Sequence, residues 1–183
     1  MHIESNLLLE TAVAQSLSLG ENVIIDGTMA WKPWVTELVT RLEREHYTIH
    51  IADVEASRDV AAARIVRRWR QGLTAALTAS GDDPAAGMGG RWLPISAVDR
   101  LFTDTRLPDG KPLHGRSVSE VNAREVSEES AAVTRYDLYR TVAVDRGPEH
   151  VERRERTPGG ELERTWAASD TQDPENAEHT DHR

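Results

Sequence analysis

The sequence has no cysteine, a single phenylalanine and no long uninterrupted hydrophobic run. Without cysteine, the protein can form neither disulfides nor thiolate metal sites, and it has no cysteine nucleophile. A transmembrane helix needs about 18 or more consecutive apolar residues, so none is predicted. Residues 1–10 lack a basic segment followed by an apolar core, which predicts no signal peptide. We therefore expect a cytoplasmic protein without a membrane partner.

Positive charge is also scarce, because the 183 residues carry 22 Lys and Arg against 31 Asp and Glu. The resulting net charge of −9 argues against general binding to nucleic acid, whose phosphates attract basic surfaces. Only 38% of the residues are hydrophobic, and the mean hydropathy is −0.55. These values fit one domain with a core, together with a solvated segment.

The first half of the chain alternates between helical and strand patterns. Apolar spacing and end signals predict helices over residues 5–19, 31–45 and 57–71, with strands over 22–26 and 47–54 between them. The Val-Ile-Ile run of the first strand is typical of a strand buried on both faces. This rhythm predicts an α/β fold with a parallel sheet and flanking helices.

The second half is less regular and ends in a charged segment. A Gly- and Asp-rich loop over 80–91 precedes a short helix ending at Phe102, a loop over 104–116, a helix over 117–133 and a strand over 135–144. Residues 146–183 contain few large apolar side chains, so they bury too little surface to offset the entropy of ordering. We predict a domain over 1–145 and a mostly disordered tail over 146–183, with a short helix near 149–156.

An acid and a hydroxyl follow the first predicted strand, in the motif Asp26-Gly27-Thr28. Ligands of open α/β sheets bind at the carboxyl edge, so this position suits substrate contact. A carboxylate there could orient Mg²⁺ or accept a proton from a substrate hydroxyl. The alternative is a simple turn, in which Asp26 caps the following helix.

Arginines gather in the third predicted helix and beyond the glycine-rich loop. Arg64 and Arg68 are four residues apart and share a helix face, and Arg91 follows the loop. Guanidinium groups suit the charge of a transferring phosphoryl group. The alternative is a solvated helix end whose arginines complement the helix dipole. The histidines show no metal-ligand spacing, so no metal site is predicted.

These elements together resemble the zeta-toxin family of P-loop kinases over roughly residues 15–105. The resemblance rests on the Gly-x-Asn-x-x-x-Asp-Gly-Thr pattern of 20–28, the segment 46–51, the Arg-bearing helix 61–68 and the Gly-Gly-Arg-x-x-Pro pattern of 89–94. It implies a phosphotransferase that uses ATP or GTP with Mg²⁺. Known members phosphorylate UDP-N-acetylglucosamine and act as toxins paired with an antitoxin. By this resemblance Asp26 and Thr28 would contact the sugar nucleotide, while Arg64 or Arg68 and Arg91 would clamp the phosphate.

The sequence departs from the family at the phosphate-binding loop. It has no Gly-x-x-x-x-Gly-Lys-[Ser/Thr], and its Gly110-Lys111 pair is followed by Pro112. We therefore expect an N-terminally truncated P-loop-kinase-like sheet that is incomplete or inactive alone and needs a missing N-terminal kinase half. One alternative is a non-catalytic remnant that binds a nucleotide sugar or another protein. Another is an unrelated α/β domain in which Asp26-Gly27-Thr28 is only a turn.

Overall fold

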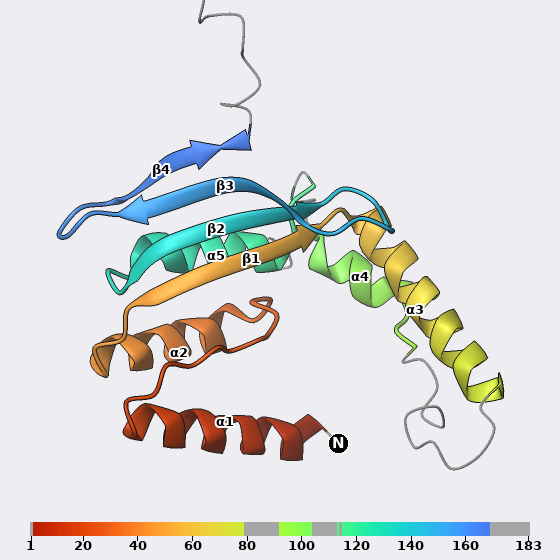
Figure 1. Ribbon diagram of the computed structural model, residues 1–183, viewed down its shortest axis with the longest axis horizontal. Helices are drawn as coiled ribbons and strands as arrows, with labels where there is room; N and C mark the ends of the chain where they lie inside the picture. The colour runs from red at the N-terminus through yellow and green to blue at the C-terminus, as the bar shows by residue number, and fades with distance from the viewer. Residues whose placement is uncertain (1, 79–91, 104–112, 114, 169–183) are drawn as a thin grey trace, which may run out of the picture.

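The computed structural model describes residues 2–78, 92–103, 113 and 115–168 (Figure 1). Helices and a single sheet make up the fold, so the predicted α/β class is confirmed. The elements follow in the order α1 (His2–Ser18), α2 (Lys32–Arg44), β1 (Ile49–Ala56), α3 (Arg58–Thr78), α4 (Ile95–Leu101), α5 (Val118–Glu129), β2 (Val133–Thr141), β3 (Glu149–Arg156) and β4 (Leu162–Ala167).

The four strands lie in the order β1-β2-β3-β4, and the sheet is mixed. β1 pairs with β2 in parallel, whereas β2 with β3 and β3 with β4 are antiparallel. The predicted parallel arrangement therefore holds for one pair of strands only. Parallel pairing requires a long crossover, and the residues between β1 and β2 include α3, α4 and α5.

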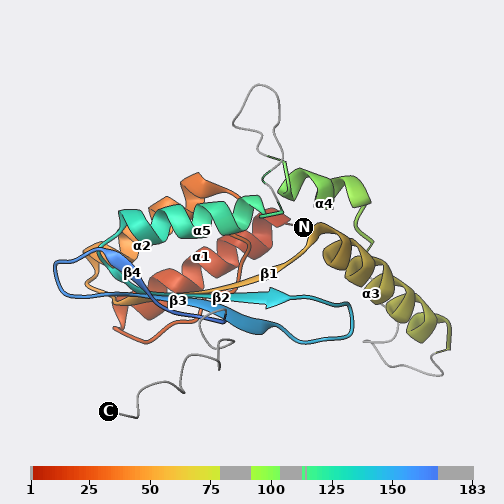
Figure 2. The same cartoon turned by 90° about the horizontal axis from the view of Figure 1, so that it is seen from above.

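The core lies between the sheet and two helices, α2 and α5, which cover the same face (Figure 2). In α2, Pro33 occupies the first turn, where its missing N–H costs nothing. Val35, Val39 and Leu42 form the buried side of this helix, at the spacing the sequence predicted. Val35 and Val39 pack with residues of α5 and the sheet, namely Ile51, Ala123, Val126, Val133, Tyr136, Leu138 and Leu162.

The prediction of a buried strand over 22–26 is wrong. These residues have no regular secondary structure, and the Ile24 side chain is fully exposed at 100%. A strand requires a neighbour to accept and donate its backbone hydrogen bonds. Within the described residues, no backbone hydrogen bond joins this segment to β1, the strand that lies beside it.

The prediction of a mostly disordered tail, with a helix near 149–156, is wrong for the residues that form β3 and β4. The two strands extend the sheet beyond β2 and contribute Leu162 to the core. Their many charged side chains find partners at long range: Arg124 of α5 pairs with Glu152 at 3.0 Å, and Arg156 donates to the Ser127 carbonyl at 2.8 Å. Residues 169–183 lie outside the described part of the chain.

Candidate functional site

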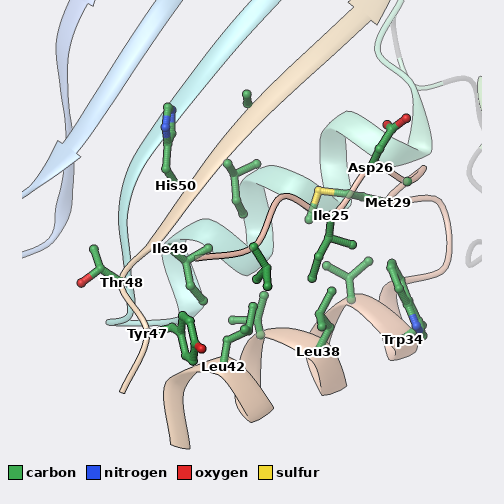
Figure 3. Close-up of a pocket in the computed structure, with 16 residues that line it drawn as sticks. Ile25, Asp26, Met29, Trp34, Leu38, Leu42, Tyr47, Thr48, Ile49 and His50 are labelled. Carbon is green, nitrogen blue, oxygen red and sulfur yellow. The ribbon is translucent and has the colours of Figure 1, made fainter. Parts of the chain in front are cut away.

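A groove of about 240 Å³ separates the segment preceding α2 from β1. Apolar side chains from both elements and from α2 line most of it, among them Val23, Ile25, Leu38, Leu42, Ile49 and Ile51. Figure 3 shows Ile25 pointing toward Leu38, whereas the carboxylate of Asp26 points away from α2. The groove therefore has an apolar floor and an acidic group at one end.

Two hydrogen bonds hold the segment that forms the outer wall of this groove. The Tyr47 hydroxyl donates to the Glu21 carbonyl at 3.0 Å, and the Asn122 Nδ2 donates to the Met29 carbonyl at 2.8 Å. The two contacts lie at opposite ends of residues 22–28. They fix the path of the segment without sheet pairing, so the segment runs alongside β1 toward its carboxyl end (Figure 1).

Asp26 and Thr28 are exposed near this end of the groove. Neither side chain has a hydrogen-bond or ion-pair partner within the described residues. The N-cap position of α2 is Trp31, and no side chain caps this helix end. Asp26 therefore does not serve as the helix cap that the turn interpretation required, and its carboxylate is open to a ligand.

The arginines of α3 lie apart from Asp26 and Thr28. Arg64 donates from Nε to the Val144 carbonyl at 3.2 Å and also from its terminal nitrogen to the Arg146 carbonyl, so it ties α3 to the residues that follow β2. Arg68 is exposed on the same helix, and Arg91 lies outside the described residues. α3 begins just after β1 and projects away from the sheet (Figure 1). Among the described residues, the ion pairs of its arginines are those of Arg58 with Asp59 and Asp99, and none involves Asp26.

The groove does not fit a nucleoside triphosphate by itself. None of the residues lining it is lysine or arginine, although phosphate groups need cationic or backbone N–H partners. No three His, Asp or Glu side chains are arranged to hold a metal ion in the described part of the chain. The groove lining therefore offers no cationic side chain to the phosphates of ATP or GTP.

A cluster of buried carboxyl groups lies beside the carboxyl half of β1, and the sequence analysis missed it. Asp53 accepts a hydrogen bond from the Tyr136 hydroxyl at 2.8 Å, and Glu55 accepts one from Ser117 at 2.9 Å. Glu120 of α5 accepts from Arg140 at 2.7 Å, while its second oxygen has no partner. Burial raises the pKa of Asp53 and raises the pKa of Glu55 to about 7, with the neighbouring Asp53 charge adding to the effect on Glu55.

The alternation of side chains in β1 could have revealed the acidic cluster. Successive strand residues point to opposite faces, so Asp53 and Glu55 share the buried face with Ile51. Val54, at the end of the predicted strand, lies on the other face and is 60% exposed. A strict period of two, started at Ile51, predicts the buried acids correctly.

We expect the free energy of unfolding to fall between pH 4.5 and 7 because of Glu55. Unfolded Glu55 loses its proton near its ordinary pKa of 4.5, whereas the folded carboxyl keeps it until about pH 7. The stability from this proton is therefore present below pH 4.5 and lost as the pH rises through 7. With allowance for solvent screening, the free energy of unfolding should decrease by about 1–2 kcal/mol between pH 4.5 and pH 8 because of Glu55. This decrease should be absent in Glu55→Gln, as measured by urea unfolding at the two pH values.

Glu45→Gln is the matched control for this experiment, because Glu45 is exposed at the end of α2. Its pH dependence should match that of the unmodified protein. An identical pH dependence in the Glu55→Gln variant would contradict the assignment of the raised pKa to Glu55.

Comparison with known proteins identifies a family over the N-terminal part of the chain. The sequence model of the zeta toxin family matches residues 1–108, which is more than half of the chain. No match was found among curated proteins or among solved structures. No helix within the described ranges is long and apolar enough to cross a membrane. The matched residues include the groove segment, α2, β1 and α3, and on this match the chain belongs to the zeta toxin family.

Proposed function

We propose that this chain supplies the substrate-binding part of a zeta-toxin-type phosphotransferase. Its substrate would be a sugar nucleotide of the UDP-N-acetylglucosamine type, and Asp26 and Thr28 would contact it. The observation that carries the proposal is that both side chains are exposed beside the groove and have no partner within the described residues. Polar groups left unpaired at the mouth of an apolar groove are typical of ligand sites.

Phosphoryl transfer would require more than this chain. The groove has no cation to hold a triphosphate, and the sequence has no Gly-x-x-x-x-Gly-Lys-[Ser/Thr] loop. The nucleotide site, with ATP or GTP and Mg²⁺, would come from a kinase part preceding Met1 or on a second polypeptide. The predicted roles of Arg64, Arg68 and Arg91 would require this kinase part to bring the phosphate to them. Arg64 would also have to release its two contacts with backbone carbonyls. An antitoxin would be a further partner.

We expect UDP-N-acetylglucosamine to raise the melting temperature of the protein. A ligand at about 100 times its Kd stabilises the native state by about 2.7 kcal/mol, and this shifts a thermal transition by several degrees. Asp26→Asn and Thr28→Ala should each reduce the shift, measured by differential scanning fluorimetry at millimolar ligand. Glu45→Gln, a change of the same kind on exposed α2, should leave the shift unchanged. The absence of a shift in the unmodified protein would refute the substrate assignment.

A non-catalytic binding function is the second candidate, and the lack of cations in the groove favours it. The two are separated by adding ATP or GTP and Mg²⁺ to the chain with the sugar nucleotide. We expect no phosphorylated product from the chain alone. If product forms only when a separate kinase part is added, the phosphotransferase function is supported. If the sugar nucleotide binds but no product forms, with or without the kinase part, the binding function is supported.

A further inference from the structure

The face of the sheet opposite α2 and α5 carries a second cluster of charged side chains, centred on Asp137 of β2. Its neighbours Tyr136 and Leu138 point into the core, so Asp137 points to the opposite face, which lacks those helices (Figure 2). The carboxylate is nevertheless fully buried. Arg135 lies two residues earlier on the same strand, and Arg153 is the direct neighbour of Asp137 on β3. Side chains from adjacent strands therefore cover this one carboxylate.

Basic groups approach Asp137 from several directions. The Nε atoms of Arg135 and Arg153 donate to its two oxygens at 2.6 Å and 2.8 Å. His50 Nε2 donates to Oδ2 at 2.7 Å, and His150 Nε2 lies 2.7 Å from Oδ1 without the geometry of a hydrogen bond. Two guanidinium groups therefore face the single carboxylate of Asp137, and Glu155 of β3 lies directly across from Arg135.

Arg135 and Arg153 each donate only their Nε–H to Asp137. Among the described residues, the terminal NH₂ groups of Arg135 and Arg153 have no hydrogen-bond or ion-pair partner, and no ion pair joins Arg153 to Glu155. The side chains of Arg135 and Arg153 are 35% and 33% exposed, so these free ends reach solvent. A guanidinium held at Nε by a buried carboxylate is oriented in advance, and ordering it for a ligand costs little entropy.

A row of aromatic rings borders the cluster and fixes His150. The His150 ring stacks on Trp166 with 4.5 Å between centroids and lies 4.8 Å from the Tyr139 ring. These contacts come from β2, β3 and β4, so the position of His150 beside Asp137 is set by the sheet itself. The two arginines therefore form a rigid basic site against an aromatic border.

We propose that the free ends of Arg135 and Arg153 bind the phosphoryl group of a small ligand on this open face of the sheet. Two guanidinium groups offer several N–H donors from two sides, which matches a tetrahedral oxyanion better than the two oxygens of a carboxylate. The proposed site differs from the sugar-nucleotide site, because neither arginine lines the groove, although His50 both lines the groove and contacts Asp137.

The test titrates the full chain with inorganic phosphate, followed by ¹H–¹⁵N correlation spectra that include the arginine Nε–H signals. We expect saturable shifts centred on Arg135 and Arg153 and weaker, unsaturated shifts with acetate at the same ionic strength. Arg135→Gln and Arg153→Gln should each weaken phosphate binding by about tenfold or more. Arg44→Gln, on exposed α2, should leave it unchanged.

Arg135→Lys provides a second variant if the glutamine changes impair folding. Lysine keeps the positive charge beside Asp137 but lacks the planar fork, so phosphate binding should still weaken while the melting temperature is retained. The proposal is overturned if phosphate produces no saturable shift, if acetate binds equally well, or if the arginine variants bind phosphate as tightly as Arg44→Gln.

Discussion

Replacing Tyr136 with alanine is expected to lower the free energy of unfolding by about 3–5 kcal/mol. Tyr136 is fully buried at the centre of the core, where its ring lies 5.8 Å from the Arg124 guanidinium carbon. Its removal leaves a cavity the size of an aromatic ring between the sheet and α5. Urea unfolding followed by circular dichroism measures the loss.

Tyr136→Phe separates packing from hydrogen bonding at the same position. The ring stays, but the hydroxyl that donates to Asp53 at 2.8 Å is lost. Burial raises the pKa of Tyr136, so this hydroxyl keeps its proton at neutral pH. Leaving Asp53 without that donor should cost about 1–3 kcal/mol. Equal stability of Tyr136→Ala and Tyr136→Phe would contradict the packing role of the ring.

Replacing Asp137 with asparagine is expected to cost about 2–4 kcal/mol at pH 7. Removing one partner of a buried ion pair typically costs about 3–5 kcal/mol, but here the partly exposed arginines can turn toward solvent, which reduces the loss. The loss arises because Arg135, Arg153 and His50 would face a neutral amide in place of a carboxylate. Urea unfolding at pH 7 measures the difference from the unmodified protein.

The pH dependence gives this prediction an internal check. The hydrogen bonds from Arg153, Arg135 and His50 outweigh the effect of burial and lower the pKa of Asp137 well below its ordinary value of 3.8. The stability from the ionised carboxylate is therefore present above pH 3.8 and lost as the pH falls toward the folded-state pKa. The difference between Asp137→Asn and the unmodified protein should shrink in that acid range. Asp59→Asn, which breaks an exposed pair with Arg58, is the control and should change the free energy of unfolding little, because exposed ion pairs stabilise weakly.

Local patterns in the sequence predicted the helices well because each helix depends mainly on its own residues. The buried stripe of α2, with Val35 and Val39, follows directly from a period near four. Gly20 lies just after α1 ends and has a φ of 68°, a left-handed value that favours glycine at a helix end. Both signals depend only on residues that are close together in the sequence.

The strands were predicted less well because their stability depends on distant partners. The apolar residues 22–26 look like a strand but have no neighbour with which to pair among the described residues. The highly charged β3 looks unable to fold, yet α5 neutralises its inner face through pairs such as Arg154 with Glu128. The buried Asp53 likewise depends on Tyr136, a residue 83 positions away.

The role of Asp26 and Thr28 stays a prediction. The structure places both side chains exposed beside a groove, while Arg64 of α3 donates to backbone carbonyls after β2. Arg64 donates hydrogen bonds to the carbonyls of Val144 and Arg146. These contacts could not be predicted from the sequence, because the two residues lie some 80 positions further along the chain. Helix spacing shows which arginines share a face but not what that face contacts.

The order of strands in the sheet has a consequence for how this chain is divided. The family match ends at residue 108, and β1 is the only strand within the described residues of that match. Every strand that pairs with or extends from β1, namely β2, β3 and β4, lies beyond the match. The matched stretch cannot complete this sheet from its own described strands, so the end of the family match and the far edge of the sheet fall at different places in the chain.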